Sequence, residues 1–186
     1  MSKPARRAVF LDRDGTIVRD VDYLTEVGQL EILPGVPEAL RLLHEAGFLL
    51  LVVTNQSAIA RGWLTEETLA AIHSELNRRL EAEGARIDAF YHCPHLPEGE
   101  VPAYARACNC RKPMPGLIER AARDWAVDLE TSYVIGDSDR DVEAGKRCGC
   151  YSILIGSASS GGADATAADL GGAAELILGR ERAQKA

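Results

Sequence analysis

The sequence predicts an α/β fold with three layers, in which helices cover both faces of a parallel sheet. Short apolar runs alternate along the chain with longer stretches of helical periodicity, which is typical of a parallel sheet. The runs are almost entirely apolar, as expected of strands that are covered on both faces. Polar and acidic residues directly follow three of the runs, at the strand ends where open sheets of this type bind ligands.

The apolar runs and the helical stretches define the predicted elements. The four strands span Ala8–Leu11, Leu49–Val53, Tyr133–Ile135 and Tyr151–Ile155. The five helices span residues 35–47, 65–84, 115–127, 139–149 and 167–179. Thr65 is expected to cap the second helix, and paired glycines weaken the last. The small polar loop 157–166 is expected to be mobile and the tail beyond residue 179 to fray.

Length, charge and the start of the chain limit the class of protein. The 186 residues suit one domain, residues 1–186, and 46% hydrophobic with 26% charged residues is an ordinary globular mixture. A net charge of −7 argues against nucleic acid or a membrane as a partner, although a small anion site remains compatible with it. Because the chain opens without an apolar signal-like stretch, we expect a cytoplasmic protein, and we expect it to be a monomer.

The segment FLDRDGT places two carboxylates, Asp12 and Asp14, at the end of the first strand. A carboxylate held there can attack phosphorus and form an aspartyl-phosphate. A second carboxyl nearby can protonate the departing oxygen and then take a proton from the water that cleaves the intermediate. Gly15 permits the positive φ of a sharp exit from the strand. An ordinary Asp-Gly turn is the alternative interpretation of this motif taken alone.

Polar residues in three other segments would complete a phosphate site. The segment TNQS offers the Thr54 hydroxyl and the Asn55 main-chain N–H to a phosphate oxygen. The segment GDSDRD supplies Asp137 and Asp141, which suit Mg²⁺, although acids there also favour the start of a helix. In the segment CRKPMPG, Lys112 would balance the charge on the transferring group. A solvated cation is the alternative for that lysine, and the prolines beside it disfavour this alternative.

Cysteine and histidine residues form a second pattern, C-x-H-x₁₂-C-x-C. Residues two apart in an extended chain point to the same side, so Cys93 and His95 would bind from one arm and Cys108 and Cys110 from the other. Three thiolates and one imidazole are the donors of a closed, structural zinc site. Two disulfides or two buried thiol pairs are the alternatives, and a reducing compartment disfavours the disulfides.

The zinc ion is expected to have a positional role. Residues 96–107 have no core pattern, so a bound ion would anchor this loop and hold Arg111 and Lys112 at the rim of the pocket. Other candidate residues are expected to have structural roles. His44 and His73 are expected to be surface or boundary residues, and His92 to point away from the cluster. Cys148 and Cys150 are expected to be small buried residues, and Trp63 and Trp125 to pack.

These motifs, in this order, resemble those of the haloacid dehalogenase (HAD) superfamily of phosphohydrolases, over most of the chain. The resemblance implies the three-layer, Rossmann-like fold of that superfamily and the roles of the matching residues. Asp12 matches the nucleophile, Asp14 the acid/base, Thr54 and Lys112 the stabilisers of the phosphoryl group, and Asp137 a Mg²⁺ ligand. The resemblance also implies that the Asp12 carboxylate and the Asp14 carbonyl oxygen complete the protein's share of the metal shell.

Within the superfamily, the zinc pattern and the flanking motifs resemble the D-glycero-D-manno-heptose 1,7-bisphosphate 7-phosphatase family. Histidinol-phosphate phosphatases share the zinc cluster and are the alternative, but they have a shorter stretch inside it. The resemblance implies the substrate-binding residues Asp20, Asp22, Tyr23, Asn55, Gln56, Ser57 and Arg111. Arg61 could assist or be solvated. Ser138 departs from the family, which commonly has Lys there, and this leaves the preferred anomer open.

The expected activity follows from this resemblance. It is the Mg²⁺-dependent removal of the 7-phosphate, which leaves heptose 1-phosphate for nucleotide-activated heptose synthesis, in lipopolysaccharide or other glycoconjugates. No stretch between the motifs is long enough for a separate cap domain, so loops and the zinc segment, residues 93–110, would enclose the substrate. A zinc-stabilised binding module with a relic pocket is the alternative from another class, and the intact set of catalytic residues argues against it.

Overall fold

A six-stranded parallel sheet forms the centre of the computed structural model, which describes residues 6–156 and 162–185. The strands are β1 (Ala8–Leu11), β2 (Leu49–Asn55), β3 (Ala89–Cys93), β4 (Tyr133–Gly136), β5 (Tyr151–Ile155) and β6 (Ala165–Ala167). Their order is β3-β2-β1-β4-β5-β6. The chain therefore winds outward in both directions from β1. Ligands bind such sheets beside the point where the winding reverses, at the carboxyl ends of the strands.

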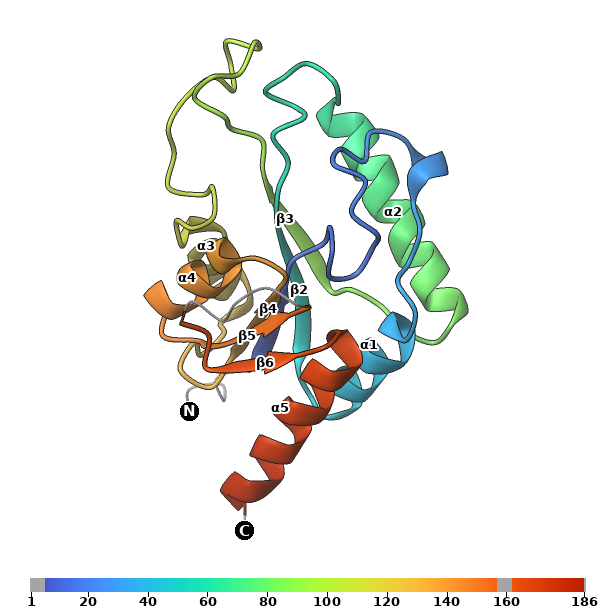
Figure 1. The fold of residues 1–186 in the computed structure, drawn as a ribbon, viewed down its shortest axis with the longest axis vertical. Helices are drawn as coiled ribbons and strands as arrows, with labels where there is room; N and C mark the ends of the chain where they lie inside the picture. Colours follow the sequence, from blue (N-terminus) through green and yellow to red (C-terminus); the bar gives the residue numbers. More distant parts are fainter. Residues whose placement is uncertain (1–5, 157–161, 186) are drawn as a thin grey trace.

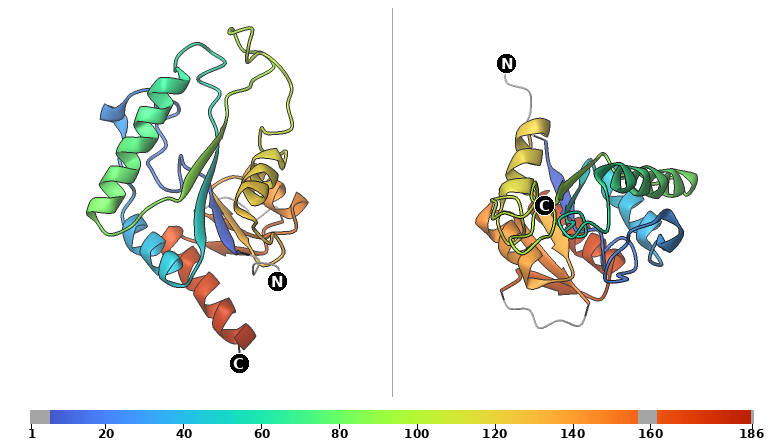
Figure 2. Two further views of the ribbon diagram at one scale, coloured as in Figure 1. Left: turned by 180° about the vertical axis from the view of Figure 1, so that it is seen from behind. Right: turned by 90° about the horizontal axis from the view of Figure 1, so that it is seen from above.

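Helices cover both faces of the sheet and confirm the predicted three-layer α/β fold (Figure 1). They are α1 (Val36–Glu45), α2 (Glu66–Ala82), α3 (Gly116–Trp125), α4 (Asp139–Arg147) and α5 (Leu170–Lys185), with a short 3₁₀ turn, η1 (Val27–Gln29). Figure 2 shows α3 and α4 on one side of the strands and α1 and α5 on the other. Thr65 caps α2 as predicted, because its Oγ1 accepts a hydrogen bond from the Thr68 amide at 3.1 Å.

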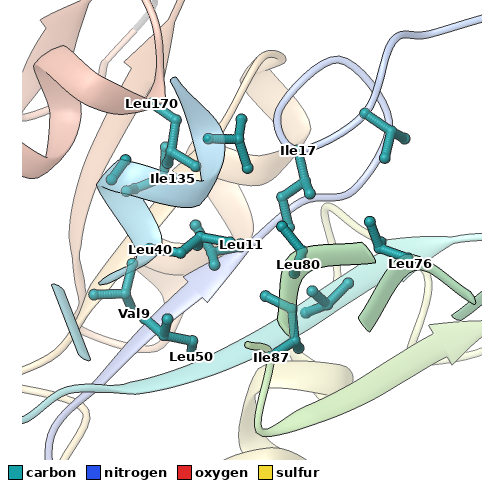
Figure 3. Packing of buried hydrophobic residues seen from close by; sticks show 14 of the residues in the cluster. Val9, Leu11, Ile17, Leu40, Leu50, Leu76, Leu80, Ile87, Ile135 and Leu170 are labelled. Carbon is teal, nitrogen blue, oxygen red and sulfur yellow. The ribbon is translucent and has the colours of Figure 1, made fainter. Parts of the chain in front are cut away.

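The apolar residues of β1 divide between two cores, one on each face of the sheet. Val9 and Leu11 pack with α1, α2 and α5 (Figure 3), whereas Ala8 and Phe10 pack with α3 and α4. All four side chains are fully buried. This double burial explains why β1 is a continuous apolar run, and it leaves only the end of the strand to carry polar chemistry.

Two strands and the end of the chain differ from the sequence prediction. The edge strand β3 has four half-buried residues before Cys93, so it lacks the apolar run that marks a central strand. The strand β6 is a three-residue piece where the predicted loop 157–166 meets the predicted last helix. The tail beyond residue 179 was predicted wrongly to fray. It continues α5, where Glu181 accepts a hydrogen bond from the Tyr133 hydroxyl at 2.8 Å and pairs with Arg7.

Two other sequence expectations concern the loop 157–166 and the membrane. Residues 157–161 of that loop lie outside the described residues, and the loop's last two residues belong to β6. Within residues 6–156 and 162–185, none of the helices combines the length and the apolar composition needed to cross a bilayer.

Candidate active site

A pocket of about 560 Å³ opens at the carboxyl ends of β1, β2 and β4. Side chains that follow all three strands line it, as the sequence predicted. The residues predicted to bind substrate also lie there, namely Asp20, Asp22, Tyr23, Asn55, Gln56, Ser57 and Arg111. The volume is within the range usual for small-molecule sites. The structure therefore brings together residues from six separate parts of the chain at one site.

Asp12 stands at the end of β1, where it meets the buried ammonium group of Lys112. The Nζ of Lys112 donates to Asp12 Oδ1 at 2.7 Å and to the carbonyl oxygen of Val53 at 2.7 Å, and it lies 2.6 Å from Asp141 Oδ1. The lysine is 4% exposed. One cation thus holds two carboxylates at the floor of the pocket, and it lies where a transferring phosphoryl group would need positive charge.

The electrostatics of this floor favour a further cation. Burial raises the pKa of Asp12 to about 7. The charge of Lys112 opposes this shift, but burial and the charge of Asp141 together outweigh it. Burial alone would lower the pKa of Lys112, but the charges of Asp12 and Asp141 raise it instead. Burial and the Asp141 charge also raise the pKa of Asp137. A divalent ion would keep these carboxylates ionised at neutral pH.

The donor atoms for such an ion are in place. Carboxylate oxygens of Asp12, Asp137 and Asp141 lie within 4.8 Å of one another, and oxygen donors of this kind suit Mg²⁺. Gly15 makes this approach possible, since a Cβ at that position would lie 2.0 Å from Asp137 Oδ2. Its φ of 78° also confirms the predicted sharp exit from β1. The group includes Asp141, which the sequence also offered for Mg²⁺ although the family resemblance did not imply it as a ligand.

Asp14 is held in place from two sides. The guanidinium of Arg13 donates to both of its carboxylate oxygens, with Nη2 at 2.9 Å from each. The amide of Gln56 donates to Asp14 Oδ2 at 3.0 Å and to Thr54 Oγ1 at 2.8 Å. The proposed acid/base and the proposed phosphoryl stabiliser are therefore joined through one glutamine.

His73 is a buried partner of this network, and its assignment as a surface or boundary residue was wrong. The side chain is 7% exposed, its ring stacks on Phe90 at 4.4 Å, and its Nε2 accepts a hydrogen bond from Arg13 Nη1 at 3.2 Å. Burial, followed by the charges of Arg13 and His92, lowers the pKa of His73 from 6.5 to about 3. The imidazole is therefore neutral at physiological pH and serves Arg13 as an acceptor.

Asn55 has a role that the sequence prediction did not give it. Its Oδ1 accepts from the Lys112 main-chain N–H at 3.0 Å, and its Nδ2 donates to the Lys112 carbonyl oxygen at 3.1 Å. The side chain thus fastens the backbone of Lys112 to the end of β2. Because both hydrogen bonds use the amide, an aspartate in this position could make only one of them.

Cys93, His95, Cys108 and Cys110 form the predicted cluster. The Sγ of Cys93 lies 3.5 Å from Cys108 Sγ and 3.1 Å from Cys110 Sγ, and His95 Nδ1 lies 3.3 Å from Cys110 Sγ. The edges of a zinc tetrahedron with Zn–S bonds of about 2.3 Å are about 3.8 Å, so these four donors fit around one ion with small movements. Cys148 and Cys150 lie outside this metal-binding group, and the His92 ring faces Glu66.

The chain is similar in sequence to known proteins. A family model described as HAD-hydrolase-like matches residues 109–175. The D-glycero-beta-D-manno-heptose-1,7-bisphosphate 7-phosphatase of Rhodopseudomonas palustris is 45% identical over 148 residues, which cover 80% of this chain and 82% of the relative. The chain belongs to the D-glycero-D-manno-heptose-1,7-bisphosphate 7-phosphatase family. Another relative, the alpha-anomer enzyme of Photorhabdus laumondii, is 34% identical over 157 residues, 83% of this chain and 86% of that one.

A solved structure of this 7-phosphatase family has the same fold. It is a D,D-heptose 1,7-bisphosphate phosphatase from B. bronchiseptica, described as complexed with magnesium and phosphate. The two sequences are 33% identical, and the match covers 94% of this chain and 99% of the solved one. The two structures superpose with a TM-score of 0.83. These comparisons confirm the predicted superfamily, the predicted family and the Rossmann-like fold.

At the mouth of the pocket, the structure groups two aromatic rings and an arginine. Trp63 was predicted to pack, but it is 52% exposed and lines the pocket. Its ring meets that of Tyr23 edge-on at 4.8 Å, and the Arg61 guanidinium lies over both rings. Trp125 does pack, against the core beneath α3, where its Nε1 donates to the Tyr91 hydroxyl.

The burial of His73 predicts a specific loss of stability in acid. Its pKa is lowered by folding, so below pH 6.5 the unfolded chain takes up a proton that the folded chain does not. The free energy of unfolding should then fall by about 1.4 kcal/mol per pH unit, or about 2 kcal/mol between pH 7 and pH 5. His73→Gln keeps an acceptor for Arg13 and should remove this component. Urea unfolding of both proteins at the two pH values measures it, and equal losses in both would contradict the prediction.

Removal of the cluster's metal is expected to free the zinc segment. Between its two arms, the segment is joined to the loop after β2 by a hydrogen bond from the Val101 amide to the Ala60 carbonyl oxygen at 2.9 Å. Burial raises the pKa of the Cys93 thiol, so without a metal the cluster is held only by weak hydrogen bonds. Chelation should therefore expose residues 96–107 to proteases and weaken substrate binding more than it destabilises the sheet. An intact and fully active segment after zinc removal, shown by elemental analysis, would contradict this.

Proposed function

We propose that this protein removes the 7-phosphate of D-glycero-D-manno-heptose 1,7-bisphosphate and leaves heptose 1-phosphate. One observation carries the proposal: Asp12, at the end of β1, accepts a hydrogen bond from the buried Lys112 Nζ at 2.7 Å. It also belongs, with Asp137 and Asp141, to a group of carboxylates that can hold Mg²⁺. That is the arrangement a carboxylate nucleophile for phosphorus requires. The names of the relatives, which are heptose-bisphosphate phosphatases, support the choice of sugar.

In the proposed reaction, an Asp12 carboxylate oxygen attacks the phosphorus, and the bond from phosphorus to the sugar oxygen breaks. Asp14 gives its proton to that oxygen, and the heptose 1-phosphate leaves. Asp14 then takes a proton from a water molecule, which attacks the phosphorus of the aspartyl-phosphate and restores Asp12. Lys112 and the Thr54 hydroxyl stabilise the phosphoryl group in both steps.

The protein's share of the metal site comes from the ends of β1 and β4. We propose the carboxylates of Asp12 and Asp137 and the carbonyl oxygen of Asp14 as the ligands. A bound Mg²⁺ would offset the repulsion between the nucleophile and the anionic phosphate. Asp141, which shares Lys112 with Asp12, keeps that lysine charged and in position.

The mouth of the pocket would recognise the sugar. The carboxylates of Asp20 and Asp22 suit hydroxyl groups, and Arg111 lines the same pocket. Gln56 lies at the phosphate-binding end, where it donates to Asp14 and Thr54. The zinc segment, residues 93–110, would fix Arg111, whose Nη1 donates to the His95 carbonyl oxygen at 3.4 Å. The proposed enzyme is one domain, residues 1–186, and acts as a cytoplasmic monomer without nucleic acid or a membrane as a partner.

Phosphate release from α- and β-heptose 1,7-bisphosphate and from histidinol phosphate, measured side by side with Mg²⁺, tests this proposal. We expect the β-anomer to have the largest kcat/KM, because the more similar of the two relatives described is named for it. Faster turnover of histidinol phosphate would overturn the substrate, and a preference for the α-anomer would overturn the anomer alone. No release from any of the three would overturn the proposal as a whole.

A further inference from the structure

A buried histidine of α2, His73, reaches the proposed catalytic centre from outside the pocket. The helix runs beside the loop that follows β1 (Figure 1). The pocket lining includes Arg13 but not His73, and the two side chains meet where His73 Nε2 lies 3.2 Å from Arg13 Nη1. The ring of Phe90 stacks on the imidazole at an angle of 13° and fixes its plane. His73 therefore contacts the centre only through Arg13.

The direction of this hydrogen bond sets the state of the imidazole. A guanidinium has only donors, so the bond requires an unprotonated Nε2 on His73, and the proton of the neutral ring is then on Nδ1. Burial lowers the pKa of His73 to about 3, so the ring stays neutral and accepts throughout the physiological range. A glutamine in this position could also accept from Arg13, whereas an apolar side chain could not.

Arg13 connects His73 with the carboxylate of Asp14. The arginine is 1% exposed, its Nε donates to Asp14 Oδ1 at 3.1 Å, and its Nη2 donates to both carboxylate oxygens at 2.9 Å. The remaining nitrogen, Nη1, meets His73. Because the guanidinium is planar and rigid, a partner that fixes one edge also fixes the other. Without an acceptor at Nη1, a buried donor would be left unpaired, and the guanidinium would shift to regain one.

The orientation of the Asp14 carboxylate matters for the proposed reaction. A general acid must lie within hydrogen-bond distance of the leaving oxygen, and a displacement of about 1 Å can lower the rate strongly. The Asp14 side chain lines the pocket and is 25% exposed, so hydrogen bonds rather than packing must orient it. Gln56 holds one of its oxygens, and Arg13 holds both.

We infer that His73 is a positioning residue for the proposed acid/base: it anchors Arg13, and Arg13 orients the Asp14 carboxylate toward the leaving oxygen. This inference rests on the proposed function and adds a residue that touches no reacting atom. The effect of His73 should depend on the leaving group. A sugar oxygen needs the proton from Asp14 to leave, whereas 4-nitrophenolate is a stable anion that leaves without one.

His73→Leu tests the inference on heptose 1,7-bisphosphate and 4-nitrophenyl phosphate. We compare kcat/KM, which reports the steps up to departure of the leaving group and omits the later hydrolysis that also uses Asp14. It should fall about 10-fold or more for the heptose and change less than about twofold for the nitrophenyl ester. His73→Phe, which keeps a ring against Phe90, should show the same pattern. His73→Gln should restore most of the heptose rate, because its amide oxygen can accept from Arg13.

Ile72→Val is the matched control, because it weakens the packing of the same helix at a fully buried position that belongs to the apolar core. It should leave both kcat/KM values within about twofold. An equal loss for both esters in His73→Leu, no loss in that variant, or an equal loss of heptose activity in His73→Gln would each overturn the inference.

Phenyl phosphate separates a failure of this inference from a failure of the proposed function. If the wild-type protein cleaves aryl phosphates but not the heptose, the proposed substrate is wrong. The same comparison is then made between phenyl and 4-nitrophenyl phosphate, because phenolate is the more basic leaving group and gains more from a proton. If the wild-type protein cleaves none of these esters, the proposed function and the inference are both overturned.

Discussion

Asp12→Asn is expected to lower Mg²⁺-dependent phosphate release by about 10⁴-fold or more. The amide that replaces the carboxylate can still accept the hydrogen bond from Lys112, but it cannot attack phosphorus. The substitution also removes one of the carboxylates that can hold the metal. Single-turnover assays with heptose 1,7-bisphosphate at saturating Mg²⁺ measure the loss.

A matched control separates the role of the nucleophile from a general change of charge. Asp139→Asn makes the same chemical change at an exposed position on the first turn of α4. Activity there should stay within about twofold, as expected for a surface charge. A variant Asp12→Asn that folds normally and keeps more than a hundredth of the wild-type rate would rule out Asp12 as the nucleophile.

Lys112→Met is expected to damage both catalysis and stability. The lysine lies between Asp12 and Asp141, so its removal leaves two buried carboxylates without a counter-charge. Breaking a buried ion pair on one side typically costs about 3–5 kcal/mol of the free energy of unfolding. The rate should fall by about 10²-fold or more, since the charge that stabilises the phosphoryl group is lost as well.

A second substitution tests whether the stability loss comes from the unpaired carboxylates. In the double variant Lys112→Met with Asp141→Asn, one of the two buried charges is neutralised. Its free energy of unfolding should recover by more than about 1 kcal/mol relative to Lys112→Met alone, while its activity should stay low. Urea unfolding in EDTA measures this coupling. The single variant Asp141→Asn completes the comparison. If the loss of unfolding free energy in the double variant equals the sum of the losses in the two single variants, Lys112 does not act through Asp141.

The sequence predicted that the proposed catalytic residues lie together, because they follow strands that are themselves easy to predict. Strands buried on both faces are continuous apolar runs, and parallel strands bring their carboxyl ends to one edge. Asp12, Thr54 and Asp137 could therefore be placed together although more than 100 residues separate the first from the last. The grouping of the four proposed zinc donors was predictable for a similar reason, since side chains two residues apart in an extended chain point to the same side.

Other features depend on contacts that no local pattern reveals. Asn55 fastens Lys112 by two hydrogen bonds across 57 residues of sequence, and nothing in TNQS distinguishes that role from substrate binding. His73 lies on a helix with an ordinary amphipathic pattern, and only the packing of α2 shows that it meets Arg13. The edge strand β3 and the helical tail escaped prediction because half-buried or charged residues compose them.

A crystal structure of the protein soaked with Mg²⁺ and beryllium fluoride tests the central claim most directly. Beryllium fluoride mimics a phosphoryl group on a carboxylate. The account predicts that beryllium is bonded to an Asp12 carboxylate oxygen, that Lys112 contacts a fluorine atom, and that Mg²⁺ lies between Asp12 and Asp137. Beryllium fluoride on another residue, or Mg²⁺ bound away from Asp137, would contradict it.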